Sequence, residues 1–250
     1  MINLTVDGKN IEAKEGLTIL QVAKQNHIDI PTLCHHDALE PHGACRLCTV
    51  EVTAGKRRRF VTACNYVVRN DIDVKTASDE VTELRKIIVE LLLARCPDVG
   101  IVKTLAKSYD IDEPRFRVED QTCILCGLCA RVCREVMGVS AISLVGRGVD
   151  ARIDTPFHLS SEVCLGCGAC AGVCPTGMIQ LRYAKGTVEI QPFNTTVELR
   201  QCISCGKDLA PAAFVDLVRK KLGSLSQVAL LCIDCKKKRE SLVLANVGHK

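Results

Sequence analysis

Tryptophan is absent from this 250-residue chain, and aromatic residues make up only 3% of it. So few rings leave little surface on which nucleic-acid bases could stack. The sequence has no run of about 18 uncharged apolar residues, so no membrane span is expected. The opening residues, MINLTVDGKN, show neither the basic nor the apolar part of a signal peptide. We therefore expect a soluble protein of a reducing cytoplasm.

Motifs for nucleotide-dependent or nucleophilic catalysis are also missing. The chain contains no G-x-G-x-x-G after a predicted strand and no G-x-x-x-x-G-K-[ST]. No Ser/His/Asp or Cys/His arrangement stands out, and the formal net charge of +4 is too small to identify a partner. We therefore expect no substrate turnover by this chain alone and assign no catalytic residue.

Cysteine is the residue in excess, with 17 copies. Eight of them form two quartets of C-x2-C-x2-C-x3-C spacing, and each cysteine of the second lies 41 residues after its counterpart. This is the ligand run of bacterial two-cluster ferredoxins, in which the fourth cysteine of one quartet ligates the other cluster. The spacing therefore predicts one 4Fe–4S cluster on Cys123, Cys126, Cys129 and Cys174, and another on Cys164, Cys167, Cys170 and Cys133.

The first 78 residues are expected to form a β-grasp sheet with one helix across it. Residues 2–6 alternate apolar and polar, and Asp7-Gly8 is a hairpin signal that would return the chain over 10–13. Thr18 can cap a helix with apolar residues on one side. Strand-like runs follow at 48–53, 59–63 and 71–74.

Four cysteines of this region are predicted to hold a 2Fe–2S cluster, with a zinc site as the alternative. They lie in a close pair and two outlying positions: Cys34, Cys45, Cys48 and Cys64. A 2Fe–2S cluster needs four thiolates, and the small Gly43 and Ala44 would let backbone N–H groups approach its sulfides. The neighbouring histidines are expected to be loop residues that could donate hydrogen bonds near the cluster: His35, His36 and His42.

The motif HGACRLCTVEV, the wide first gap and the return to Cys64 resemble the N-terminal domain of the large iron–sulfur subunit of NADH–quinone oxidoreductase. The same module is typical of the diaphorase small subunit of NAD-reducing hydrogenases and of electron-bifurcating iron hydrogenases. A predicted helix over 79–95 and the order of the two quartets also match. The resemblance covers about residues 1–184.

One departure from that pattern concerns the segment after this helix. The relatives usually carry a histidine and three cysteines there, which bind a further cluster. Here only Cys96 is present, in LLLARCPDVG. One thiolate cannot hold a cubane, so we expect that cluster to be absent and Cys96 to be a buried thiol at the helix end. The helix itself is expected to carry apolar residues on one face: Val81, Leu84, Ile87, Ile88, Leu91 and Leu92.

The last part of the chain carries two more C-x2-C pairs on either side of a predicted helix over 212–222: Cys202, Cys205, Cys232 and Cys235. Four thiolates in tetrahedral array suit structural zinc, and a metal would help to fold so small a segment. A third 4Fe–4S cluster is the alternative, because iron also accepts four cysteines.

Together these features predict an α+β chain of four parts. They are a β-grasp 2Fe–2S ferredoxin-like domain over 1–78, a helical connector over 79–114, a two-cluster 4Fe–4S ferredoxin domain over 115–184, with a hairpin near 146–154, and a zinc-ribbon-like tail over 185–250.

The resemblance implies an electron-transfer subunit of a multisubunit NAD(P)-linked oxidoreductase that could be electron-bifurcating. Its partners would be a flavin- and NAD(P)-binding subunit at the 2Fe–2S end and, at the cubane end, ferredoxin or a catalytic subunit of hydrogenase, formate dehydrogenase or transhydrogenase type. Two alternatives stay open. The basic runs at 56–59, 219–221 and 236–239 would suit a nucleic-acid-associated iron–sulfur or zinc protein, and the chain could also be a free-standing polyferredoxin.

Overall fold

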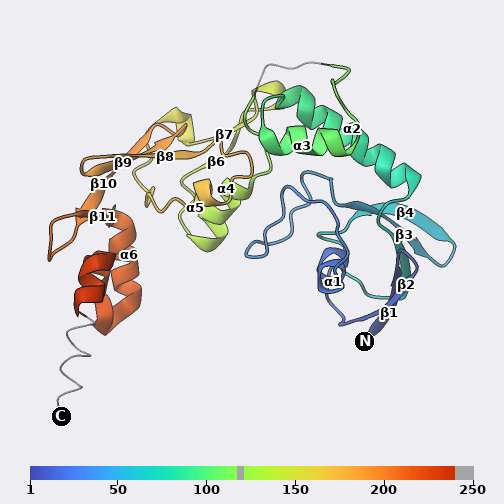
Figure 1. Cartoon of the computed structure of the whole chain (residues 1–250), viewed down its shortest axis with the longest axis horizontal. Helices are drawn as coiled ribbons and strands as arrows, with labels where there is room; N and C mark the ends of the chain where they lie inside the picture. The colour runs from blue at the N-terminus through green and yellow to red at the C-terminus, as the bar shows by residue number, and fades with distance from the viewer. Residues whose placement is uncertain (117–120, 240–250) are drawn as a thin grey trace, which may run out of the picture. The chain divides into compact units, whose positions relative to one another are not determined.

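The computed structural model of the chain describes residues 1–116 and 121–239 (Figure 1). The chain divides into two compact units, Met1–Leu128 and Cys129–Lys250. None of the helices in the described residues is long and apolar enough to cross a membrane. The C-terminal end of the predicted tail, residues 240–250, lies outside the described residues.

The first unit is built on a five-stranded sheet with strand order β2-β1-β5-β3-β4. β1 and β5 are parallel, and the other neighbours are antiparallel. The strands are β1 Ile2–Val6, β2 Lys9–Ala13, β3 Thr49–Ala54, β4 Arg57–Thr62 and β5 Ile72–Lys75, and the helices are α1 Ile19–Gln25, α2 Asp79–Arg95 and α3 Gly100–Ser108. The β-grasp prediction is confirmed in its strands and its crossing helix.

Local sequence signals account for the first turns of this unit. Asp7 and Gly8 both adopt positive φ, 48° and 79°, as the two-residue turn of a β-hairpin requires. Thr18 caps α1 through a capping box with Gln21: the Gln21 backbone N–H donates to Thr18 Oγ1, and the Gln21 side chain accepts from the Thr18 N–H. The buried residues of α1 pack with Val50 and Val52 of β3 in the main core.

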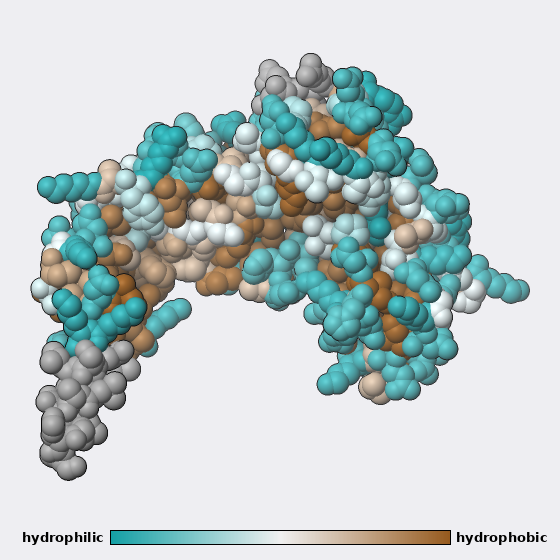
Figure 2. Space-filling model, viewed as in Figure 1, coloured by the Kyte–Doolittle hydropathy of each residue, from teal (hydrophilic) through white to brown (hydrophobic). Residues whose placement is uncertain are grey.

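Helix α2 has the predicted bounds, and of the apolar residues expected on one face only Val81 is buried. Leu84, Ile87 and Leu91 are exposed by 37%, 45% and 50%, and apolar atoms reach the surface over α2 and α3 (Figure 2). The buried residues are Val81, Arg85, Val89, Glu90, Leu93 and Ala94.

Two charged residues on the buried face of α2 form hydrogen bonds with groups distant in sequence. Arg85 Nη2 donates to the Thr49 carbonyl at 2.8 Å. The Glu90 carboxylate accepts three hydrogen bonds from Arg115, from its backbone N–H at 2.8 Å, Nε at 2.7 Å and Nη2 at 2.6 Å. Contacts 25 and 36 residues apart in sequence cannot be read from the periodicity of one helix.

The second unit contains a four-stranded sheet of order β11-β10-β9-β8 and the two-stranded hairpin β6–β7. Its strands are β6 Ser143–Val145, β7 Arg152–Asp154, β8 Gln180–Ala184, β9 Thr187–Gln191, β10 Thr195–Gln201 and β11 Asp208–Pro211. The longest helix is α6 Ala212–Leu222, as predicted. Shorter helical turns are α4 Leu128–Arg131, which begins at the unit boundary, η1 Val132–Val136, η2 Gly148–Asp150, η3 Pro156–His158, α5 Ala169–Gly172 and η4 Gly223–Leu230.

The domain boundary expected between residues 184 and 185 falls in the turn between β8 and β9. These strands pair from Gln180 with Gln191 to Ala184 with Thr187. The sheet therefore takes β8 from the predicted ferredoxin part and the other strands from the predicted tail.

The buried face of α2 can be tested with two leucines two positions apart. Leu93 is 6% exposed, whereas Leu91 is 50% exposed. We expect Leu93→Ala to lower the free energy of unfolding by about 2–5 kcal/mol, because it empties a buried site. Leu91→Ala should change it by less than about 1 kcal/mol. Urea unfolding of the two full-length variants measures both, and equal destabilisation would contradict the observed face.

Candidate functional site

The structure brings the four N-terminal cysteines together in two sulfur pairs. A hydrogen bond between the Cys34 and Cys45 side chains lowers the pKa of Cys45 to about 5 and raises that of Cys34. A second such bond, between Cys64 and Cys48, lowers the pKa of Cys48 to about 7. The Cys45 backbone N–H also donates to Cys34 Sγ at 3.3 Å. The charges of Cys48, Cys34 and Cys45 help to raise the pKa of Cys64, so the two pairs lie near each other.

A glycine allows the loop that carries these cysteines to lie close to Asn65. Gly43 has φ +68°, and a Cβ added there would lie 2.9 Å from Asn65 Nδ2, next to Cys64. Four converging thiols with a backbone N–H donor to sulfur are the donor set that a 2Fe–2S cluster needs. The residues present therefore fit the group, and the assignment of ligands stays a prediction.

The histidines of this loop lie outside the sulfur set. His35 is nearly buried, and its Nε2 contacts Asp37 Oδ1 at 3.0 Å; Asp37 in turn pairs with Lys24 at 2.7 Å. The His36 Nδ1 accepts the backbone N–H of Ala38 at 3.2 Å. Both rings hydrogen-bond within the loop itself.

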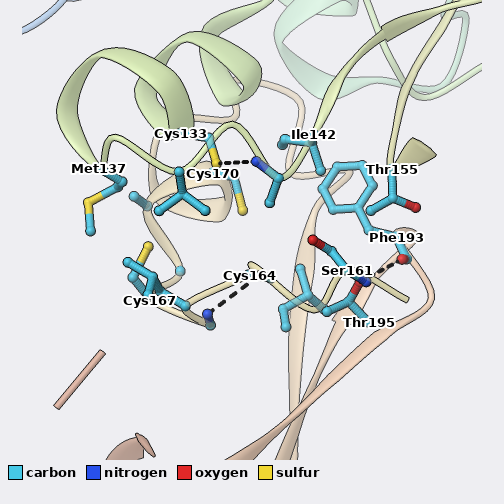
Figure 3. Close-up of a pocket in the computed structure, with 17 residues that line it drawn as sticks. Cys133, Met137, Ile142, Thr155, Ser161, Cys164, Cys167, Cys170, Phe193 and Thr195 are labelled. Atoms are coloured by element: carbon cyan, nitrogen blue, oxygen red, sulfur yellow. Dashed lines mark hydrogen bonds between the residues drawn. The ribbon is translucent and has the colours of Figure 1, made fainter. Parts of the chain in front are cut away.

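The cysteines of the second predicted cubane line one cavity in the second unit: Cys133, Cys164, Cys167 and Cys170. Figure 3 shows Cys133 and Cys170 on one side of it, with Phe193 and Thr195 facing them. Backbone N–H groups donate to two of the sulfurs, from Ala141 to Cys133 at 3.3 Å and from Gly166 to Cys164 at 3.4 Å. Burial, with the neighbouring sulfur charges, raises the pKa of Cys170 to about 12.

This cavity meets the needs of a cubane. Its remaining lining is mostly apolar, from Met137, Val139, Ala141, Ile142 and Leu165 among others. Four sulfurs around an apolar space, with amide donors to the sulfurs, match the ligation of a 4Fe–4S cluster. Cys133, which belongs to the other quartet in sequence, lies where the swapped-ligand prediction requires it. The assignment itself remains a prediction from the spacing.

The four cysteines of the first predicted cubane differ in their exposure. Cys126 and Cys129 are buried, while Cys123 and Cys174 are half-buried. The Leu125 backbone N–H contacts Cys123 Sγ at 3.4 Å, and Cys174 Sγ lies 3.4 Å from Thr176 Oγ1. The grouping of these four cysteines remains the prediction made from their spacing.

The four cysteines of the C-terminal pairs form the most compact group. Their sulfur atoms, on Cys202, Cys205, Cys232 and Cys235, all lie within 4.8 Å of one another. The Cys232 N–H donates to Cys202 Sγ at 3.3 Å, and backbone donors of this kind lower the pKa of Cys202 to about 6. The thiolate is the metal-binding form of cysteine, so this bond favours coordination.

The spacing of these sulfurs can be compared with that around one tetrahedral ion. Zinc–sulfur bonds of about 2.3 Å place the corners of a tetrahedron about 3.8 Å apart. The Cys205 and Cys232 sulfurs lie 3.6 Å apart. Four irons would stand between the thiolates of a cubane and hold them further apart. Within residues 1–116 and 121–239, no other three metal-binding side chains gather so closely.

Cys96 belongs to none of these groups. It ends α2, is fully buried, and its burial raises the pKa to about 11. This confirms the prediction of a buried thiol at the helix end.

Sequence reasoning missed the residues that close the second cubane cavity from the C-terminal side. Ile190, Phe193 and Thr195 line it, from β9, the following turn and the start of β10. The quartet spacing carries no information about such a wall, and a single buried aromatic in a hairpin has no recognisable motif.

Comparison with known families gives two matches. Residues 1–79 match the 2Fe-2S iron-sulfur cluster binding domain, and residues 122–178 match the 4Fe-4S dicluster domain. The cluster types predicted for these two regions agree with the families they match. Residues 185–250 lie outside both matched ranges.

Similar proteins are subunits of oxidoreductases and of a hydrogenase. The chain is 34% identical over 180 residues to the NADPH-Fe(3+) oxidoreductase subunit alpha of Geobacter sulfurreducens, which covers 62% of this chain and 21% of that protein. It is 36% identical over 180 residues to the NADH-ubiquinone oxidoreductase 75 kDa subunit of Reclinomonas americana, with 62% and 26% covered. It is 33% identical over 190 residues to the NADP-reducing hydrogenase subunit HndD of Solidesulfovibrio fructosivorans, with 64% and 32% covered.

A solved structure of NAD+-reducing [NiFe]-hydrogenase in the H2-reduced state superposes with a TM-score of 0.55 and 26% identity, covering 62% of this chain and 74% of that one. The chain spans between 21% and 32% of the length of the three relatives above. The predicted resemblance to NAD(P)-linked iron–sulfur subunits is confirmed.

The exchange of fourth ligands between the quartets predicts the effect of Cys133→Ala. This change should damage the cluster built on Cys164, Cys167 and Cys170, because Cys133 lines their cavity. Low-temperature EPR of the dithionite-reduced protein would show that cubane signal lost or converted. The matched control is Cys96→Ala, a buried cysteine outside all the predicted sets, which should leave every signal intact. Damage confined to the cluster of Cys123, Cys126 and Cys129 would contradict the exchange.

Proposed function

We propose that this chain is an electron-transfer subunit of a multisubunit NAD(P)-linked oxidoreductase. The observation that carries the proposal is the combination of two matched iron–sulfur domains in one chain, each with a complete set of cysteines. The similarity to subunits of NADH-ubiquinone oxidoreductase and of NADP-reducing hydrogenase supports it. It also favours electron transfer over the nucleic-acid-binding alternative.

Iron–sulfur clusters supply one-electron transfer, and we propose three on this chain. The residues Cys34, Cys45, Cys48 and Cys64 would hold the 2Fe–2S cluster. The two quartets would hold the 4Fe–4S clusters with exchanged fourth ligands. The chain's own part is to fix the sulfurs, to donate backbone N–H groups to them and to limit water around them, because these factors set reduction potentials.

The kind of partner follows from the number of electrons that each carrier transfers. A hydride from NAD(P)H carries two electrons, whereas an iron–sulfur cluster ordinarily passes one. A flavin can divide the pair, so we place flavin and nucleotide on a partner subunit that docks near the 2Fe–2S set. At the cubane end the chain would exchange electrons with ferredoxin or a catalytic subunit of hydrogenase, formate dehydrogenase or transhydrogenase type. Electron bifurcation by the whole complex is compatible with this arrangement.

We propose a structural zinc ion for the C-terminal cysteines. The support is the distance between their sulfurs, all within 4.8 Å, which suits one tetrahedral ion. The ion would join the segment after β10 to the segment after η4, since Cys202 and Cys232 lie 30 residues apart. All 17 cysteines are free of disulfides, which suits a reducing compartment such as the cytoplasm.

The metal content tests the cofactor assignment. One 2Fe–2S and two 4Fe–4S clusters contain about ten irons in total, and the tail adds about one zinc. Elemental analysis of anaerobically purified protein should give these values. Paired Cys205→Ser and Cys235→Ser changes should remove the zinc and leave the iron. About fourteen irons without zinc would reassign the tail to a third cubane, and about two irons or fewer would refute the function.

Reduction by nucleotides tests the assignment of the flavin to a partner. The chain purified alone should be bleached by dithionite but not by NADH or NADPH, because the sequence shows no nucleotide-binding motif. Adding the flavoprotein partner should restore bleaching, beginning with the 2Fe–2S signal. Rapid reduction of the isolated, flavin-free chain by either nucleotide would be incompatible with this function.

A further inference from the structure

The β9–β10 hairpin forms one wall of the cavity of the second predicted cubane. Ile190 at the end of β9, Phe193 in the turn and Thr195 at the start of β10 line the same space as the four cysteines (Figure 3). Phe193 is 2% exposed and Thr195 is 1% exposed. A ring so completely buried against the ligands keeps water from this side of the site.

Hydrogen bonds tie this wall to the segment that leads into the ligand loop. Thr195 Oγ1 accepts the Ser161 backbone N–H at 3.1 Å and donates to the Phe193 carbonyl at 2.9 Å. Ser161 lies three residues before Cys164, and both line the cavity. One hydroxyl therefore fixes the turn that carries the ring and the backbone that approaches the first ligand.

The sheet also presses directly on the ligand loop. Gly166, between the ligands Cys164 and Cys167, has φ +66°. A Cβ added there would lie 2.4 Å from Val197 Cγ2 of β10 and 2.9 Å from Pro211 of β11. Those distances leave no room for a side chain at position 166. The backbone of the loop therefore packs directly against side chains of these two strands.

The same sheet continues into the proposed zinc site. β10 ends at Gln201, and Cys202 follows it directly. The Cys202 N–H donates to the Lys207 carbonyl at 2.8 Å, which closes the turn between β10 and β11. β10 therefore ends, and β11 begins, at the turn that carries Cys202 and Cys205, where the proposed metal would bind.

We propose that the β9–β10 hairpin is a wall that excludes water from the second 4Fe–4S cluster and thereby lowers the reduction potential of that cluster. The inference rests on the ligand set proposed above and concerns residues beyond both matched domains. Reduction adds a negative charge to a cluster that four thiolates already make negative. A low-polarity wall disfavours the more highly charged state, and the solvent access of a metal site helps to set its potential.

Two phenylalanines of the second unit provide a matched test. Phe193→Ala opens the wall, whereas Phe157→Ala removes a ring that is 93% exposed. In EPR-monitored redox titrations of the full chain, Phe193→Ala should raise the midpoint potential of the cubane on Cys164, Cys167 and Cys170. We expect a change of about tenfold in its reduction equilibrium, equal to about 59 mV for one electron. Phe157→Ala should leave that potential unchanged, and the 2Fe–2S potential should stay constant in both.

A further variant guards against a folding defect. Phe193→Leu keeps an apolar side chain of similar size, so its potential should stay near that of the unaltered protein. If iron content and all EPR signals persist in Phe193→Ala but the potential does not move, the wall has no role and the proposal fails while the proposed function stands. If the unaltered chain lacks the cubane signals, the proposed function itself fails. Loss of the cubane in Phe193→Ala but not in Phe193→Leu would support the wall as a requirement for the site.

Discussion

The separation of sulfur atoms is the constraint on which the rest of this structure depends. Thiolates repel one another, so each set needs a backbone that brings them together and N–H groups that offset their charge. Backbone N–H groups contact sulfur in the N-terminal set, the cavity of the second cubane and the C-terminal group alike. The spacing of the sulfurs differs between the sets. The four C-terminal sulfurs lie within 4.8 Å of one another, while those of the second predicted cubane line a cavity. The same residue type therefore forms a compact group in one place and lines a larger space in another.

The parts of the fold that depend on local chemistry could be predicted from the sequence. The Asp7-Gly8 turn, the Thr18 cap and the bounds of α6 follow from residues within a few positions of one another. The buried face of α2 could not, because both sides of this helix carry apolar residues. Arg85 and Glu90 lie on the side that is buried, and their hydrogen-bond partners, Thr49 and Arg115, come from elsewhere in the chain.

The sets of cysteines could be proposed from the sequence, whereas the residues around them could not. Repeated cysteine spacing names the ligands, because a cluster requires a fixed number of thiolates from a tight loop. It does not name what covers them. Phe193 and Thr195 reach the cavity only through the pairing of β8, β9 and β10, which carries the chain back past Cys164. A predicted boundary after residue 184 separated these walls from the ligands that they cover.

The close packing around Gly166 limits how the chain can be shortened or substituted. Shortening the protein at residue 184 would not release a smaller, self-sufficient ferredoxin, because β8 would lose its neighbour and the ligand loop would lose Val197 and Pro211. A substitution at Gly166 would require changes at Val197 or Pro211, because a Cβ at position 166 would meet both. The segment predicted as a separate tail therefore pairs with β8 and packs against the loop of the second quartet.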